Sequence, residues 1–108
     1  MISQTMQDAL NEQINKELFS SYLYLSMAAY FASKNLPGFA GWMHKQSGEE
    51  REHAMKLYEH LEDRGGRVVL KAIAAPKTEW ASNLEAFKEA AAHEAMISAS
   101  IHALYETA

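Results

Sequence analysis

The placement of the helix-breaking residues constrains the fold of this chain more than any other feature of its sequence. Only 2 of the 108 residues are proline and 5 are glycine. The breakers predict three long helices, over about residues 5–34, 39–64 and 82–108. A turn signal, Asn35-Leu36-Pro37-Gly38, closes the first segment, and Gly65-Gly66 closes the second. Ser82 with Glu85 three residues later is a capping-box start for the third, and Thr5 with Asp8 is a weaker one for the first.

The connector over residues 66–81 predicts how the helices are ordered in space. Some 15 extended residues reach roughly 50 Å, whereas a helix of 26 residues is about 39 Å long. The connector can therefore travel the full length of the second helix and start the third helix at the opposite end. We expect an all-α up-down bundle, forming one domain over residues 1–108, with one long crossover that makes the second and third helices parallel.

Each predicted helix has a seam of residues spaced three and four apart, as expected for a side that packs into a bundle core. The seams are Leu10, Ile14, Glu17, Ser21, Tyr24, Ala28 and Phe31; then Phe39, Met43, Gln46, Glu50, His53, Leu57 and Leu61; then Leu84, Phe87, Ala91, Glu94, Ser98, Ile101 and Tyr105. Every seam is apolar near its ends and carries a glutamate near its middle. His53 lies one turn from Glu50 on the same side of the second helix.

Three carboxylates at one level of a small core predict a bound metal ion. Removing each carboxylate from water costs several kcal/mol, and the seams provide no Lys or Arg at that level to offset the charge. Carboxylate oxygens with one imidazole suit iron or manganese. A single helical glutamate is usually a solvated surface residue, and Glu-x-x-His occurs often by chance. The metal hypothesis depends on the coincidence of three mid-seam carboxylates.

Composition excludes several classes of function. The chain has 10 Lys+Arg against 14 Asp+Glu, a formal charge of −4, and no basic cluster, so we expect neither a nucleic-acid partner nor a membrane partner. It has no cysteine, which excludes disulfides and thiolate sites and fits a reducing cytoplasm. The uncharged stretch over residues 18–33 is too short and too rich in serine and tyrosine for a bilayer span, and no signal peptide is visible.

Several segments together resemble the non-haem ferritins of bacteria. They are residues 15–27 (NKELFSSYLYLSM), 41–43 (GWM), 49–56 (EEREHAMK), 64–68 (RGGRV) and the pair His93-Glu94. The resemblance covers essentially the whole chain and implies a ferritin-like four-helix plan. It also implies an iron-storage subunit with ferroxidase activity, which oxidises Fe²⁺ to Fe³⁺ with O₂ or peroxide. Such subunits form a homo-oligomeric shell that holds the iron as a mineral.

The resemblance also implies roles for individual residues in a di-iron site. Glu17, Glu50 and His53 match the ligands of one iron, with Glu50 bridging to a second iron that Glu94 partly holds. Tyr24 matches the tyrosine beside this centre, which hydrogen-bonds a ligand or joins the electron transfer.

Two further positions refine this assignment. Glu49 matches a carboxylate that helps to hold a third, more transient iron. Haem-binding relatives have a methionine where this chain has Glu52, so the resemblance implies no haem.

The sequence departs from the family pattern in its length. Family members continue into a fourth long helix, which supplies further ligands, and usually a short fifth. We therefore expect a truncated, cleaved or engineered subunit, or a bundle that another copy completes, with a dimer as one outcome. The alternative hypothesis is a ferritin-derived assembly protein that binds metal with little or no ferroxidase activity. A weaker one is a di-metal protein of the same class that acts on another substrate.

Overall fold

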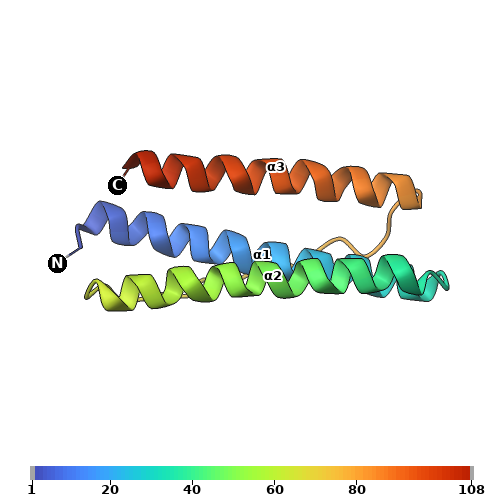
Figure 1. Ribbon diagram of the computed structural model, residues 1–108, viewed down its shortest axis with the longest axis horizontal. Coiled ribbons are helices and arrows are strands. Elements are labelled where there is room, and N and C mark those ends of the chain that lie inside the picture. Colours follow the sequence, from blue (N-terminus) through green and yellow to red (C-terminus); the bar gives the residue numbers. More distant parts are fainter. Residues whose placement is uncertain (1, 108) are drawn as a thin grey trace.

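The computed structural model describes residues 2–107, which form three α-helices: α1 (Gln4–Ser33), α2 (Pro37–Asp63) and α3 (Asn83–Thr107). Helix α2 runs antiparallel to α1, and α3 runs parallel to α2 (Figure 1). The predicted all-helical class and the long crossover before the third helix are both confirmed. No helix within residues 2–107 is long and apolar enough to cross a membrane.

The helix ends differ from the prediction at two places. Ser3, and not Thr5, caps α1, because its hydroxyl accepts the Met6 N–H over 3.1 Å. Pro37 starts α2 instead of standing before it. The first turn of a helix leaves its N–H groups without intrahelical acceptors, so a residue that has no N–H is tolerated there.

The start of α3 follows the prediction. The Glu85 N–H donates to the Ser82 hydroxyl over 3.1 Å, as a capping residue requires. The end of α2 is also as expected, since Gly65 follows it with a φ of 79°, a left-handed conformation that glycine adopts without steric cost.

The connector between α2 and α3 lies along α1. Its hydrogen bonds to α1 include, from the start of α1 to its end, Gln7 with Arg67 (3.0 Å), Asn11 with Arg67 and Val69 (3.0 and 2.9 Å), Ser26 with Lys77 (2.6 Å) and Tyr30 with Trp80 (3.4 Å). Side chains of α1 thus satisfy backbone groups of a segment that has no regular structure of its own. This path starts α3 at the far end of the bundle (Figure 1).

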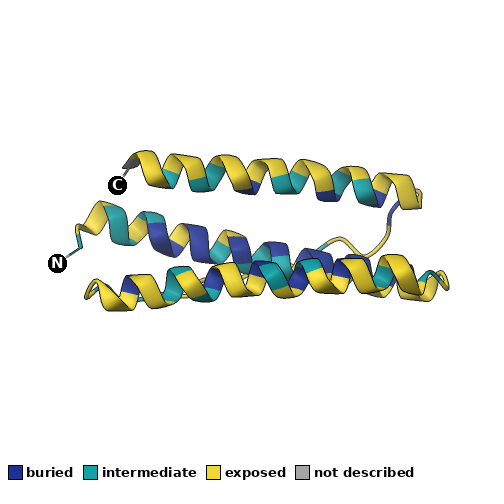
Figure 2. Cartoon of the chain, in the orientation of Figure 1, coloured by how far each residue is buried: buried dark blue, intermediate teal, exposed yellow. Residues whose placement is uncertain are grey.

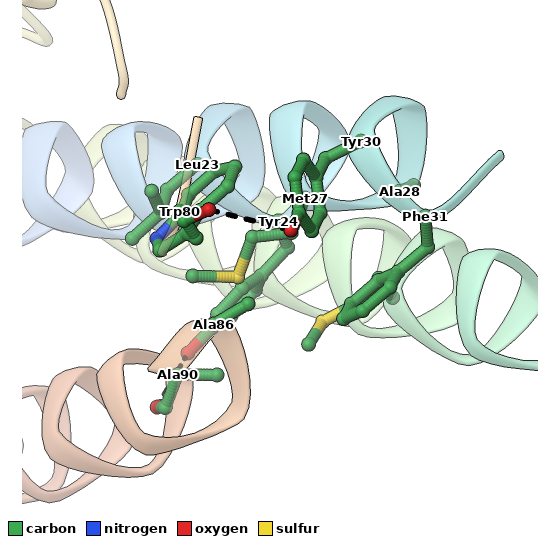
Figure 3. Packing of buried hydrophobic residues seen from close by; sticks show 10 residues of the cluster. Leu23, Tyr24, Met27, Ala28, Tyr30, Phe31, Trp80, Ala86 and Ala90 are labelled. Atoms are coloured by element: carbon green, nitrogen blue, oxygen red, sulfur yellow. Dashed lines mark hydrogen bonds between the residues drawn. The ribbon is translucent and has the colours of Figure 1, made fainter. Parts of the chain in front are cut away.

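The apolar core is divided into two clusters along the bundle. The larger contains Tyr24, Met27, Phe31 and Met43, with Trp80 of the connector against it (Figure 3). The smaller consists of Leu10, Ile14 and Leu61 with partly buried neighbours. On α1, the residues between these clusters include the mid-seam Glu17.

The predicted seam of α3 describes only part of what that helix packs: Phe87 lies against the larger core cluster, but no residue of the seam is fully buried. The buried side chains of α3 are Ala86, Ala90 and Ile97, whereas Leu84 and Tyr105 of the predicted seam are 62% and 75% exposed. The physical reason is that the backbone of α3 closely approaches α1 but not α2. Exposed residues accordingly dominate α3, while buried ones concentrate on α1 (Figure 2).

Candidate metal centre

Glu17, Glu50 and His53 meet near the middle of the α1–α2 pair. The His53 Nδ1 atom lies 3.6 Å from Glu50 Oε2 and 3.9 Å from Glu17 Oε2. One potential ligand atom from each of the three lies within 4.8 Å of the others. The two carboxylates are 0% and 3% exposed, and the imidazole is half-exposed. A single cation could therefore contact all three side chains with small movements.

The two buried carboxylates have too few partners. Glu17 Oε1 accepts a hydrogen bond from Gln13 over 3.3 Å, but Glu17 Oε2 and Glu50 Oε2 have no hydrogen-bond partner. Among residues 2–107, neither carboxylate pairs with a Lys or an Arg. Buried acceptors without donors are rare in folded proteins, and a bound cation is one explanation for them.

The electrostatics of Glu50 lead to the same conclusion. Burial, followed by the Glu17 and Glu94 carboxyl groups, raises the pKa of Glu50 from its ordinary 4.5 to about 10. Without a cation the centre therefore retains a proton at neutral pH. A divalent ion would displace that proton, and two carboxylates with one imidazole form a donor set that suits iron or manganese.

Glu94 lies beside this group rather than within it. The Tyr24 hydroxyl donates to Glu94 Oε1 over 2.7 Å and also lies 3.4 Å from the Ala90 carbonyl. Burial raises the pKa of Tyr24 above its usual range, and the hydrogen bond to Glu94 adds to this effect, so the phenol remains a donor. Glu94 still influences Glu50, whose pKa it helps to raise.

The other predicted ligand, Glu49, does not join the cluster. It is half-buried and adjoins Glu50 in the chain, but it lies outside the group of mutually close ligand atoms found among the described residues. Its contribution to a third iron stays a prediction.

The sequence reasoning missed one residue beside the centre, His93. Its Nε2 atom lies 2.6 Å from the hydroxyl of the fully buried Ser20. Burial lowers the pKa of His93, against the opposing effect of Glu94. A signal was available: Ala86, Ala90, His93 and Ile97 are spaced four, three and four apart, which is the pattern of a packed helix side.

Two hollows, each lined by residues of all three helices, flank the centre. One, of about 330 Å³, is lined by Glu17 and His53 together with Leu57, Ile101 and other residues. The other, of about 170 Å³, is lined by residues that include Tyr24 and Glu94. The first hollow thus reaches two residues of the cluster, and the second reaches the hydrogen-bonded pair beside it.

A helical bundle that carries a glutamate on one helix and a Glu-x-x-His pair on the next has the arrangement of carboxylate-type metal proteins. Residues 7–108 match the family model described as the ferritin-like domain. The chain belongs to the ferritin family.

Individual relatives agree with this assignment. The bacterial non-heme ferritin of Bacteroides fragilis is 43% identical over 108 residues, all of this chain and 68% of that protein. The bacterial non-heme ferritin of Staphylococcus epidermidis is 41% identical, with 65% of its length covered. This chain therefore spans about two thirds of the length of these relatives.

Solved structures show the same likeness in three dimensions. A closed form of the Archaeoglobus fulgidus ferritin, engineered by site-directed mutagenesis, superposes with a TM-score of 0.96 at 50% identity, covering 99% of this chain and 65% of that one. The open-pore ferritin of the same archaeon gives a TM-score of 0.95 at 50% identity, covering 98% of this chain and 65% of that one.

Proposed function

We propose that this chain belongs to an iron-storage subunit and that Glu17, Glu50 and His53 bind Fe²⁺ for oxidation. The observation that carries the proposal is a pair of buried carboxylates whose Oε2 atoms lack partners and lie 3.6–3.9 Å from one imidazole nitrogen. Family membership supplies the choice of iron.

The proposed reaction moves electrons from iron to oxygen. Two Fe²⁺ ions each lose one electron, and O₂ that takes up both electrons and two protons becomes hydrogen peroxide. Anionic ligands favour Fe³⁺ over Fe²⁺, so Glu17 and Glu50 lower the energy of the oxidised ion. The Fe³⁺ product then leaves for storage as a mineral in a shell of many copies.

The remaining residues have narrower roles in this proposal. Glu50 bridges to a second Fe²⁺, which Glu94 also contacts, and Glu49 contributes to a third, transient site. Tyr24 holds Glu94 through its hydroxyl and takes part in electron transfer. No role for haem is proposed.

A second candidate function is metal binding without turnover. The observation that favours it is the position of Glu94, which is hydrogen-bonded to Tyr24 and lies outside the three-residue cluster. A second Fe²⁺ would then have few ligands within this chain, and a two-electron reduction of O₂ would be slow.

Crystals soaked anaerobically in Fe²⁺ test the binding step. Anomalous scattering at the iron edge should show a peak between Glu17, Glu50 and His53, and a Glu17→Gln, Glu50→Gln double variant should lose it. An Fe²⁺ peak only at surface carboxylates would contradict the proposal. O₂-dependent formation of Fe³⁺ above the protein-free rate then separates the ferroxidase from the silent alternative.

A further inference from the structure

The hydrogen bond between Ser20 and His93 is the shortest polar contact between α1 and α3 among the described residues. It measures 2.6 Å, against 2.7 Å for Tyr24 with Glu94, and 3.4 Å for both Tyr24 with the Ala90 carbonyl and Lys16 with Ser100. Ser20 has no exposed surface. A buried hydrogen bond of this kind is costly to break, because water cannot replace the lost partner.

The direction of this hydrogen bond follows from the hydroxyl of Ser20. Its single proton is directed to the Lys16 carbonyl, 2.9 Å away on the preceding turn. The oxygen therefore accepts from His93, whose Nε2 carries the proton. This assignment comes from the hydrogen-bond network and fixes the tautomer of the ring.

Aromatic contacts hold the same imidazole in place. The ring of Phe19 lies 5.8 Å from it, and the ring of Tyr24 meets it edge-on at 6.0 Å. Tyr24 thus contacts His93 with its ring and Glu94 with its hydroxyl.

The neighbouring residue in the chain is Glu94, whose carboxyl group interacts with that of Glu50. Consecutive residues of a helix project about 100° apart, so locking one of them fixes the direction of the other. The backbone of α3 closely approaches α1 but not α2, so contacts with α1, together with the Phe87 ring against Phe39 and Trp42 of α2, set its rotation and its axial position. Ser20 and His93 provide one such contact directly beside the centre.

We propose that His93 is a positioning residue of the metal centre, whose Nε2–H···Oγ hydrogen bond to Ser20 fixes the rotation of α3 on α1 and so holds Glu94 toward Glu50. This inference rests on the proposed function, since the direction of Glu94 matters for binding only if a metal ion occupies the centre.

Titration with Co²⁺, followed by calorimetry and by the visible absorption of the bound ion, tests the inference. Outer-shell partners of metal ligands typically contribute about tenfold to affinity or more. We expect His93→Leu and Ser20→Ala to weaken Co²⁺ binding by about tenfold and to change the absorption spectrum. His93→Gln should restore most of the affinity, because its amide nitrogen can donate from nearly the position of Nε2.

A double-mutant cycle with Glu94→Ala separates positioning from general destabilisation. If His93 acts through Glu94, the His93→Leu, Glu94→Ala double variant binds Co²⁺ no more weakly than Glu94→Ala alone. Additive losses, or a His93→Gln variant as weak as His93→Leu, overturn the inference. Circular dichroism of each variant checks the fold, and Ser20→Ala with His93→Gln provide the test if His93→Leu does not fold.

The proposed function has its own failure signal. If the parent chain binds Co²⁺ no better than the Glu17→Gln, Glu50→Gln variant, the metal centre itself is wrong. A different result would leave the metal centre in place: the parent binds Co²⁺, and Glu94→Ala weakens that binding whereas His93→Leu does not. In that case only the positioning role of His93 is wrong.

Discussion

Tyr24 joins α1 to α3 by donating its phenolic hydrogen to Glu94 Oε1 over 2.7 Å. The tyrosine is almost fully buried, and its partner is the only residue of the four predicted di-iron ligands that α3 contributes. One hydrogen bond therefore connects the packing of the third helix with the direction of a candidate ligand.

Tyr24→Phe removes this hydrogen bond while it leaves the ring in the core. We expect the free energy of unfolding to fall by about 1–2 kcal/mol, because the carboxylate loses a buried donor. Urea denaturation measures the change, and Tyr22→Phe on the exposed side of α1 is the matched control. Slower O₂-dependent Fe³⁺ formation and weaker metal binding should accompany it, because Tyr24 holds Glu94. Equal stability of the two variants would show that the bond contributes little.

Glu50→Gln should stabilise the metal-free chain, increasingly so as pH rises. Burial, followed by the Glu17 and Glu94 carboxyl groups, raises the pKa of Glu50 from its ordinary 4.5 in the unfolded chain to about 10 in the folded one. Between these values the folded state holds a proton that the unfolded state has released, so parent stability falls as pH increases. The amide of the variant does not titrate. Thermal unfolding with a chelator should therefore show a difference in midpoint between Glu50→Gln and the parent that is larger at pH 8 than at pH 5.

Added metal should make the parent more stable than Glu50→Gln. Co²⁺ stabilises the parent by binding only its folded state, whereas Glu50→Gln lacks the anionic ligand and gains little. If the difference between the two unfolding midpoints does not change with pH, the raised pKa of Glu50 is contradicted. If Co²⁺ leaves that difference unchanged, the role of Glu50 as a ligand is contradicted.

Glu50→Ala should slow iron oxidation more than removal of any other single ligand. A bridging carboxylate serves two metal ions, so its loss affects both. The measurement is the initial rate of Fe³⁺ formation under air, with Glu52→Ala as the control because its side chain is exposed on the same helix. A rate equal to that of the parent would remove the bridging assignment.

Asn11→Ala should weaken the attachment of the start of the connector to α1. Its side chain donates to the Arg67 carbonyl and accepts from the Val69 N–H, and both backbone groups would lose their partner. A cost of about 2 kcal/mol or more in urea denaturation is expected.

The neighbouring residue offers a contrast. Glu12→Ala breaks the exposed ion pair with Lys71, 3.2 Å long, and should cost about 0–1 kcal/mol. If the two variants are equally stable, the connector is not held by Asn11.

The first helix was predictable from spacing because both of its neighbours cover it. Six of its seven seam residues are buried, and Ser21 is half-buried. The meeting of Glu17, Glu50 and His53 followed from their shared level on two antiparallel helices. Here, local pattern and tertiary packing agree.

The third helix was not predictable in the same way. Large apolar residues marked one side of α3, but its buried residues are Ala86, Ala90 and Ile97, and the two alanines lie in the larger core cluster with residues of α1. Small residues carry little weight in a hydrophobic pattern, so the packed side and His93 within it went unrecognised. The exact direction of Glu94 depends on that same interface and was beyond spacing arguments.

The long path of the connector also bears on the order in which the chain folds. Helices α1 and α2 are joined by a short turn and can pair early, whereas α3 has to wait until residues 64–82 have closed a large loop along α1. Because the backbone of α3 closely approaches α1 but not α2, α3 is the element expected to open at the lowest free energy. Glu17, Glu50 and His53 would thus come together first, and Glu94 would be the last candidate ligand to arrive and the first to leave.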